Sequence, residues 1–257
     1  QRALDSLAEW AALWQMEISI NKCFTLNIGK IPASVSLSGS NYHINNSSLP
    51  TVSSCRDLGI IISHDLSPRE HVNAIVLKAH QRANIILRCF VSKDDKVLLR
   101  AFCTYVRPIL EYNSVVWSPI LKCDIDAVER VQRRFTKRLR GMNRYSYTDR
   151  LTKLELITLE LRRLQNDLVM CYQIVFSLID LKFTDFFTFS PSVVTRGHMF
   201  KLFKSRGVGA RNNFFVNRVI HVWNALSPDI VDFSSLCAFK RTIKLADFFN
   251  NLKASMF

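Results

Sequence analysis

The chain has 257 residues, a formal net charge of +14 and a pI near 9.7, and 48% of its residues are apolar. This apolar content supports a packed core and excludes wholesale disorder, and the length allows one large domain or two small ones. Only 7 glycines occur, where an average chain of this size has roughly 18, which disfavours a turn-rich all-β fold and glycine-rich phosphate loops. The excess of Lys and Arg predicts an anionic partner, nucleic acid ahead of an anionic membrane.

Residues 1–62 have the pattern of a small α+β piece. Apolar residues at helical spacing predict a helix over residues 4–14. Strand-like runs bounded by Asn, Ser, Gly and Pro follow. They predict strands at Cys23–Ile28, Ser34–Ser38, Tyr42–Asn45 and Leu58–Ile62.

From residue 63 onward the apolar spacing becomes helical. Ser67–Glu70 (SPRE) predicts a helix start with a capping box. Ser92 with Asp95 marks a second helix start, and for the paired carboxylates of Asp94 and Asp95 capping is favoured over metal binding. Pro108 should divide that helix. Further helices are predicted at about Asp124–Met142, Thr158–Leu178, Asn213–Trp223 and Ser235–Phe249.

Cysteine usage and apolar runs bear on the compartment. The 7 cysteines include no CxxC pair, which indicates a reducing, intracellular location, nucleus or cytoplasm, with the thiols packed as small core residues. The longest uncharged apolar stretch, Leu168–Ile179, is too short to span a bilayer, so no membrane partner is expected. The chain begins at Gln1 without a secretory signal and has the character of a piece of a longer protein.

The helix predicted at about Asp124–Met142 carries the sharpest functional signal. Its apolar residues recur at steps of three or four and form one face. The other positions hold seven cations with no acidic residue between the first and the last: Arg130, Arg133, Arg134, Lys137, Arg138, Arg140 and Arg144. Like charges repel, so an anion is needed to offset them, and a nucleic-acid backbone does so with release of counterions. The alternative is an ordinary solvated basic face.

A second basic region follows, with no acidic residue between Asp185 and Asp229. Its basic residues are Arg196, Lys201, Lys204, Arg206, Arg211 and Arg218, and the first five are the candidate nucleic-acid contacts. Aromatic residues are interleaved with them: Phe200, Phe203, Phe214, Phe215 and Trp223. Cations with stacking rings suit single strands or RNA, whereas the alternative is that most of these rings belong to the core. The sequence predicts no catalytic residue and no metal ligand.

Several motifs in order resemble LINE-type (non-LTR) retrotransposon reverse transcriptases, jockey-like RNA-directed DNA polymerases, in the region after the catalytic core. The main ones are Arg107–Tyr112 (RPILEY), Val116–Pro119 (VWSP) and Glu129–Lys137 (ERVQRRFTK). Supporting ones are Tyr147–Leu151 (YTDRL), Leu159–Arg163 (LELRR), Thr195–His198 (TRGH), Phe214–Phe215, Arg218–Ile220 and Trp223–Asn224. The resemblance covers nearly the whole chain.

The resemblance implies a layout. Residues 1–62 would be the end of the palm with Leu58-Gly59 as the primer-grip-like turn, residues 63–180 the helical thumb, and residues 181–257 a basic C-terminal extension. The expected fold class is therefore mainly α with a small α+β N-terminal piece, a truncated palm followed by a thumb-like bundle. The family's catalytic aspartates precede this region, so the chain alone is expected to be inactive and to hold no cofactor, while the parent polymerase would need Mg²⁺.

The functional expectation is a fragment that holds nucleic acid for an RNA-directed DNA polymerase of a mobile element. Its partners would be RNA and DNA, as a template–primer duplex, and the missing N-terminal part of the parent polymerase. Phosphate contacts position such a duplex without reading its sequence. The alternative is a non-enzymatic helical protein-interaction module, in which the apolar stripes dock onto another protein.

Overall fold

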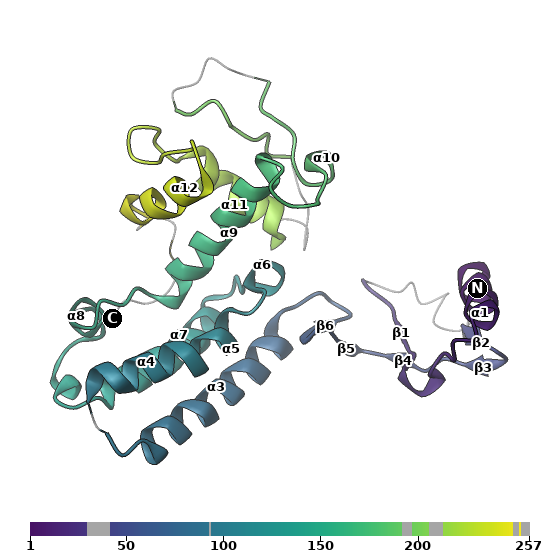
Figure 1. Ribbon diagram of the computed structural model, residues 1–257, viewed down its shortest axis with the longest axis horizontal. Helices are drawn as coiled ribbons and strands as arrows, with labels where there is room; N and C mark the ends of the chain where they lie inside the picture. The colour runs from purple at the N-terminus through teal and green to yellow at the C-terminus, as the bar shows by residue number, and fades with distance from the viewer. Residues whose placement is uncertain (30–41, 93, 192–196, 206–212, 249–251, 253–257) are drawn as a thin grey trace. The chain divides into compact units, whose positions relative to one another are not determined.

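The computed structural model describes residues 1–29, 42–92, 94–191, 197–205, 213–248 and 252 (Figure 1). The described residues are mainly helical, with short named strands only in the N-terminal part. The expected class, mainly α with a small α+β piece, is therefore confirmed. The chain divides into two compact units, Gln1–His71 and Val72–Phe257.

The N-terminal unit begins with α1 (Arg2–Leu13) and one 3₁₀ turn (Ile20–Lys22). Short strands follow: β1 (Thr25–Leu26), β2 (His43–Ile44), β3 (Ser47–Ser48), β4 (Thr51–Val52), β5 (Ser54–Asp57) and β6 (Ile60–Ser63). They form three separate pairs, β1 with β4 in parallel, and β2 with β3 and β5 with β6 antiparallel. The amide of Gln1 bonds the backbone of His43 at 2.9 and 3.1 Å, which ties the start of α1 to β2.

The strand predictions succeed only in part. The runs at 23–28 and 42–45 contain β1 and β2, but each strand is two residues long. The predicted strand at 58–62 is wrong at its start, because Leu58 and Gly59 form the turn of the β5–β6 hairpin, where Asp57 pairs with Ile60. The prediction at 34–38 lies outside the described residues. β5 was missed because its sequence, SCRD, has no apolar alternation.

α3 (Arg69–Cys89) starts where the SPRE sequence predicts a helix, and the Ser67 hydroxyl accepts from the Arg69 N–H at 3.4 Å. The predicted capping box is wrong. The Glu70 carboxylate instead accepts from the hydroxyls of Ser54 and Ser63, at 3.1 and 3.4 Å. Because those two serines face each other across β5 and β6, Glu70 ties the hairpin to the first turn of α3.

The next segment contains α4 (Asp95–Tyr105), α5 (Arg107–Glu111) and α6 (Ser114–Trp117). Two local sequence features in it, a capping residue and a proline, have the effects that were expected. The Asp94 carboxylate caps α4 by accepting from the Lys96 N–H at 2.8 Å, so its predicted capping role is confirmed. The helix is interrupted at Val106, and Pro108 occupies the first turn of the next helix, α5. The predicted division at this proline is therefore confirmed.

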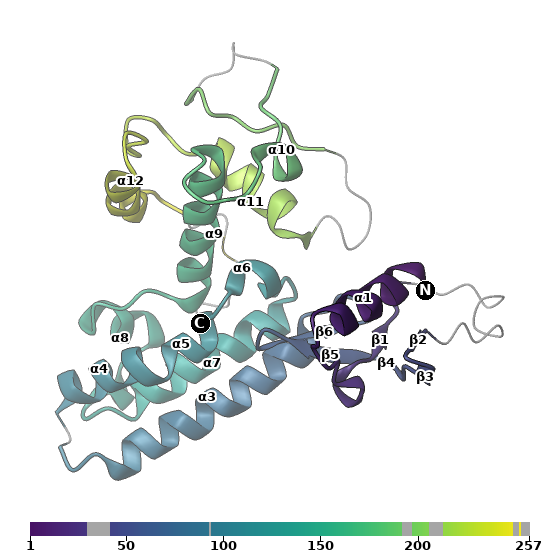
Figure 2. The same cartoon turned by 45° about the vertical axis from the view of Figure 1, so that its right-hand side comes forward.

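α7 (Lys122–Lys137) lies side by side with α3 and α4 (Figures 1 and 2). Its buried Phe135 stacks on Phe102 of α4, with ring centres 4.5 Å apart. The helix ends before the predicted Met142, because i→i+3 bonds tighten the chain after Lys137 and Gly141 then adopts a φ of +71°. The expectation of seven cations on one helix is therefore wrong, since Arg138 is the C-cap of α7, and Arg140 and Arg144 lie beyond it.

The remaining helical segments are a 3₁₀ turn (Met142–Arg144), α8 (Tyr147–Lys153), α9 (Leu159–Val175), α10 (Phe183–Phe186), α11 (Phe215–Asn224), α12 (Leu236–Thr242) and a 3₁₀ turn (Ile243–Leu245). The helices α6, α7, α11 and α12 pack against α9. Side-chain caps at Ser146, Thr158 and Ser235 start α8, α9 and α12. The last predicted helix, at 235–249, is correct in place but shorter than expected.

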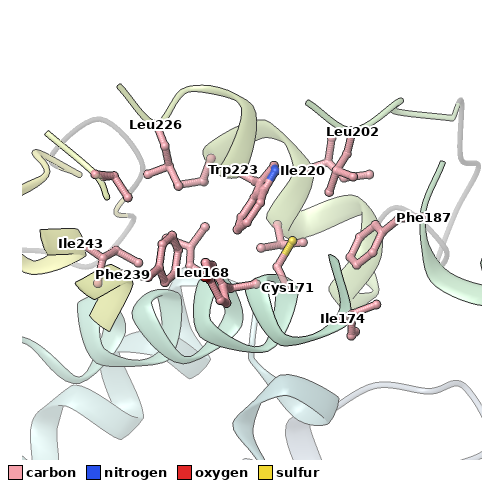
Figure 3. Packing of buried hydrophobic residues seen from close by; sticks show 14 of the residues in the cluster. Leu168, Cys171, Ile174, Phe187, Leu202, Ile220, Trp223, Leu226, Phe239 and Ile243 are labelled. Carbon is pink, nitrogen blue, oxygen red and sulfur yellow. The ribbon is translucent and has the colours of Figure 1, made fainter. Parts of the chain in front are cut away.

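One apolar core joins α9, α11 and α12 (Figure 3). Its members include Leu168 and Cys171 of α9, Ile220 and Trp223 of α11, and Phe239 of α12, all at most 2% exposed. The Trp223 indole N–H donates to the Phe200 carbonyl at 2.7 Å, and the Trp223 carbonyl pairs with His198 Nε2 at 2.8 Å. His198 of the TRGH motif is thus part of this core, and burial lowers its pKa.

All seven cysteines are free thiols, but their expected role as core residues is largely wrong. Only Cys171 is buried, whereas Cys89, Cys123 and Cys237 are exposed, because the phase of each helix turns these positions toward solvent. Across the described ranges, no helix combines the length and the apolar composition needed to cross a bilayer. Within the same ranges, no three His, Cys, Asp or Glu side chains gather as metal ligands.

Candidate nucleic-acid interface

Three arginines follow one another at intervals of one helical turn along α7 and its C-cap residue. They are Arg130, Arg134 and Arg138, and all three are exposed. Residues four apart lie above one another on a helix, so the three guanidinium groups form a row. In the part of the chain that the structure describes, none of the three pairs with a carboxylate. The row therefore presents uncompensated positive charge.

α3 contributes the second side of this surface. Arg138 donates from Nη1 to Oδ1 of Asn84 at 2.6 Å. One turn earlier on α3, His80 lies near Arg130 and Arg134: burial lowers the His80 pKa most, and these two charges lower it further. Arg88, one turn after Asn84, is exposed. We call these six residues the basic face: His80, Asn84, Arg88, Arg130, Arg134 and Arg138.

The other predicted cations of this region lie elsewhere. Arg133 is half-buried and stacks on Tyr147, with its guanidinium carbon 4.9 Å from the ring centre. Arg144 lies over the Tyr145 ring at 5.2 Å. Lys137 and Arg140 are exposed near the end of α7. The structure thus brings only three of the seven cations into one row.

A buried hydrogen-bond network holds α7, α8 and α9 together behind the basic face. Glu129, with no exposed surface, accepts from the Tyr147 hydroxyl and from the Leu159 N–H, the latter at 2.9 Å. The Gln132 amide donates to the Tyr147 hydroxyl at 3.1 Å and to the Ile157 carbonyl at 3.0 Å. Burial raises the pKa of Glu129 and of Tyr147. Sequence reasoning missed this role, although Glu129 and Gln132 are three apart on the apolar side of α7.

The second basic region is only partly described. Lys201 is half-buried and Lys204 is exposed, while Arg196, Arg206 and Arg211 lie outside the described residues. The rings divide between two environments. Trp223 is fully buried and Phe200 packs against the same core, whereas Phe203 and Phe214 are 53% and 44% exposed. Of these candidate residues in the described part of the chain, Lys204, Phe203 and Phe214 are therefore exposed.

The predicted primer-grip-like residues form the tip of the β5–β6 hairpin. Leu58 and Gly59 have φ of +44° and +90°, the positive values that a two-residue type I′ turn requires at both positions. Asn followed by Gly is the usual sequence there, because a branched L side chain is strained at positive φ. Leu58 is also 82% exposed. The hairpin thus keeps an exposed leucine at a position where its backbone is strained.

Leu58→Asn is expected to stabilise the protein by about 1 kcal/mol, since asparagine tolerates the left-handed region better than leucine. Urea denaturation followed by circular dichroism measures the change. Leu58→Ala is the matched control, because alanine keeps a Cβ at the same φ. Equal stability of the asparagine and alanine variants would contradict the strain argument.

Nucleic-acid binding at the basic face is expected to strengthen as the pH falls from 7.5 to 6.0. In the free protein, burial, Arg134 and Arg130 lower the pKa of His80. A bound phosphate opposes the two arginines and raises this pKa, so binding takes up a proton and is favoured at lower pH. Fluorescence anisotropy of a labelled duplex at each pH checks this. His80→Gln should reduce the dependence of the affinity on pH. An unchanged pH dependence in this variant would contradict the assignment of the proton uptake to His80.

A comparison of the chain with protein-family models, with curated proteins and with solved structures finds no match in any of the three.

Proposed function

We propose that the chain holds a nucleic-acid duplex, a primer–template in the mobile-element reverse transcriptase that its motifs resemble. The observation that carries this proposal is the row of Arg130, Arg134 and Arg138 beside α3. An isolated row of like charges is unfavourable unless a polyanion offsets it. A duplex supplies that polyanion and gains affinity from counterion release.

The dimensions of the row suit this partner. Four residues rise by about 6 Å along a helix, so the three guanidinium groups span about 12 Å. Duplex DNA carries one negative charge per roughly 1.7 Å of its axis, and several phosphates therefore face such a row at once. Arginine binds phosphate oxygens with two parallel N–H groups. These contacts hold a duplex irrespective of sequence, as a thumb does, and the proposal assigns the chemical step to the catalytic part of the parent polymerase.

A salt titration of the intact chain tests the proposal. Affinity for a primer–template duplex, measured by fluorescence anisotropy, is expected to fall with salt with a log–log slope of about −3 or steeper, roughly 0.9 per phosphate contact. Hybrid, DNA and RNA duplexes should give similar slopes. Binding that ignores salt, or no binding at 0.05 M salt, would overturn the proposal.

A second candidate, a protein-interaction module, is favoured by one observation in the N-terminal unit. α1 and the residues after it expose large apolar side chains, with Leu13, Trp14 and Met16 79%, 64% and 57% exposed. Apolar patches of this kind mark interaction sites. Salt-insensitive binding of a protein partner that Trp14→Ser abolishes would support this candidate.

A further inference from the structure

Tyr147, the first residue of α8, lies between two cations and beside one carboxylate. The guanidinium carbons of Arg133 and Arg150 are 4.9 and 5.5 Å from the centre of its ring. Its hydroxyl donates to the carboxylate of Glu129, which has no exposed surface. An acidic group thus accompanies the two cations inside the protein, as the cost of burying uncompensated charge requires.

Tyr145, just before α8, also lies between two cations, but no carboxylate accompanies them. The guanidinium carbon of Arg144 is 5.2 Å and the Lys153 Nζ is 4.1 Å from the centre of its ring. In the part of the chain that the structure describes, neither cation pairs with a carboxylate. Asp149, the acidic residue nearest to Tyr145 along the sequence, instead accepts from the Ser146 hydroxyl at 2.6 Å.

The backbone around Tyr145 holds this ring in place. The Tyr145 N–H donates to the Met142 carbonyl at 3.2 Å, and the Tyr145 carbonyl accepts from Nη1 of the buried Arg150 at 2.7 Å. A side-chain hydrogen bond from Lys153, followed by the charge of Arg144, lowers the pKa of the Tyr145 hydroxyl. Because this hydroxyl oxygen accepts from Lys153, its own proton is available for donation to an anion.

The two cations are open to solvent and their charge is not neutralised. Arg144 and Lys153 are exposed, and Tyr145 is half-buried. A ring attracts an exposed cation by about 0.5–1 kcal/mol, but it has no net charge, and two cations over one ring repel each other. A phosphate group removes this repulsion. Its oxygens accept two parallel N–H groups from an arginine and a single strong hydrogen bond from a lysine.

We propose that Arg144, Tyr145 and Lys153, the Tyr145 group, bind a phosphate of the nucleic-acid backbone, as a second contact that shares no residue with the basic face. The guanidinium group, the ammonium group and the phenol hydroxyl all donate to this phosphate. The choice of nucleic acid as its source rests on the proposed function. Inorganic phosphate shares the same chemistry, and the experiments separate the two sources.

Anisotropy titrations of the full chain with a labelled primer–template duplex measure the contribution of the Tyr145 group. Arg144→Gln with Lys153→Gln should lower the affinity about tenfold and make the log–log salt slope shallower by about one unit, the loss of one phosphate contact. Arg241→Gln with Lys244→Gln removes the same two charges from exposed positions near α12 and should leave the slope nearly unchanged. Tyr145→Phe should weaken binding about threefold at an unchanged slope, because the lost donor is neutral.

Fluorine NMR of the chain labelled with 3-fluorotyrosine observes Tyr145 directly, and Tyr145→Phe assigns its resonance. Saturating duplex is expected to move this resonance, also after Arg130, Arg134 and Arg138 are replaced by alanine, so the Tyr145 group and the basic face can fail separately. A resonance that moves with inorganic phosphate while no duplex binds would refute the duplex-holding function and the nucleic-acid source. An unmoved resonance at saturating duplex, or a slope that the control pair lowers equally, would overturn the proposal.

Discussion

Replacing Arg130, Arg134 and Arg138 together by alanine is expected to lower the affinity for a primer–template duplex on the order of 100-fold at 0.1 M salt. The log–log salt slope should become shallower by two to three units, about 0.9 for each lost phosphate contact. The expectation rests on geometry, because these three exposed arginines lie in one row and none pairs with a carboxylate within the described residues. Anisotropy titrations at four or more salt concentrations measure both quantities.

Two sets of three substitutions serve as controls. Lys240, Arg241 and Lys244 are exposed cations near α12, and their replacement by alanine removes the same charge from the protein but should leave the slope nearly unchanged. Arg133, Lys137 and Arg140 are predicted contacts that lie off the basic face, and their loss should have an intermediate effect. A slope that falls equally for all three sets would show that net charge, rather than the row on α7, governs binding.

Signals that depend on a few neighbouring residues could be read from the sequence. The capping carboxylate of Asp94, the helix start after Thr158 and the break at Pro108 all lie where they were predicted. Each depends on hydrogen bonds or steric limits within about four residues. The mainly α class follows for the same reason, because the helices are long enough to show a 3.6-residue period.

Features set by tertiary packing could not be read in this way. Nothing in the sequence of α3 shows that Asn84 accepts a hydrogen bond from Arg138. Which helices pack side by side depends on the folding of the whole unit. The sequence does not distinguish these cations from one another, but in the structure Arg133 stacks on the ring of Tyr147 instead of joining the row. Glu129 is a buried acceptor, although a glutamate in an amphipathic helix normally faces solvent. The candidate site was therefore predicted in composition but not in geometry.

Arg218→Met is expected to destabilise the protein by about 3–5 kcal/mol, the cost of leaving a buried charge without its partner. Arg218 donates to both oxygens of Asp167 at 2.7 and 3.0 Å and to the Val115 carbonyl at 2.8 Å. The Asp167 side chain is only 2% exposed. Burial raises the Asp167 pKa while Arg218 lowers it, so removing the arginine leaves the penalty of burial uncompensated. Guanidinium denaturation followed by circular dichroism measures the loss.

The double variant Asp167→Leu with Arg218→Met completes the test. Replacing both charges by apolar groups removes the penalty, so the double variant should be more stable than Arg218→Met alone.

The pH dependence of the stability gives an independent check. A carboxyl group whose pKa is raised by folding stabilises the native state below its unfolded pKa, near 3.9, and loses that contribution as the pH rises through the folded value. The loss of unfolding free energy caused by Arg218→Met should therefore be smaller at pH 5 than at pH 8. A loss that does not depend on pH would mean that Arg218 stabilises the protein through packing and its carbonyl contacts instead.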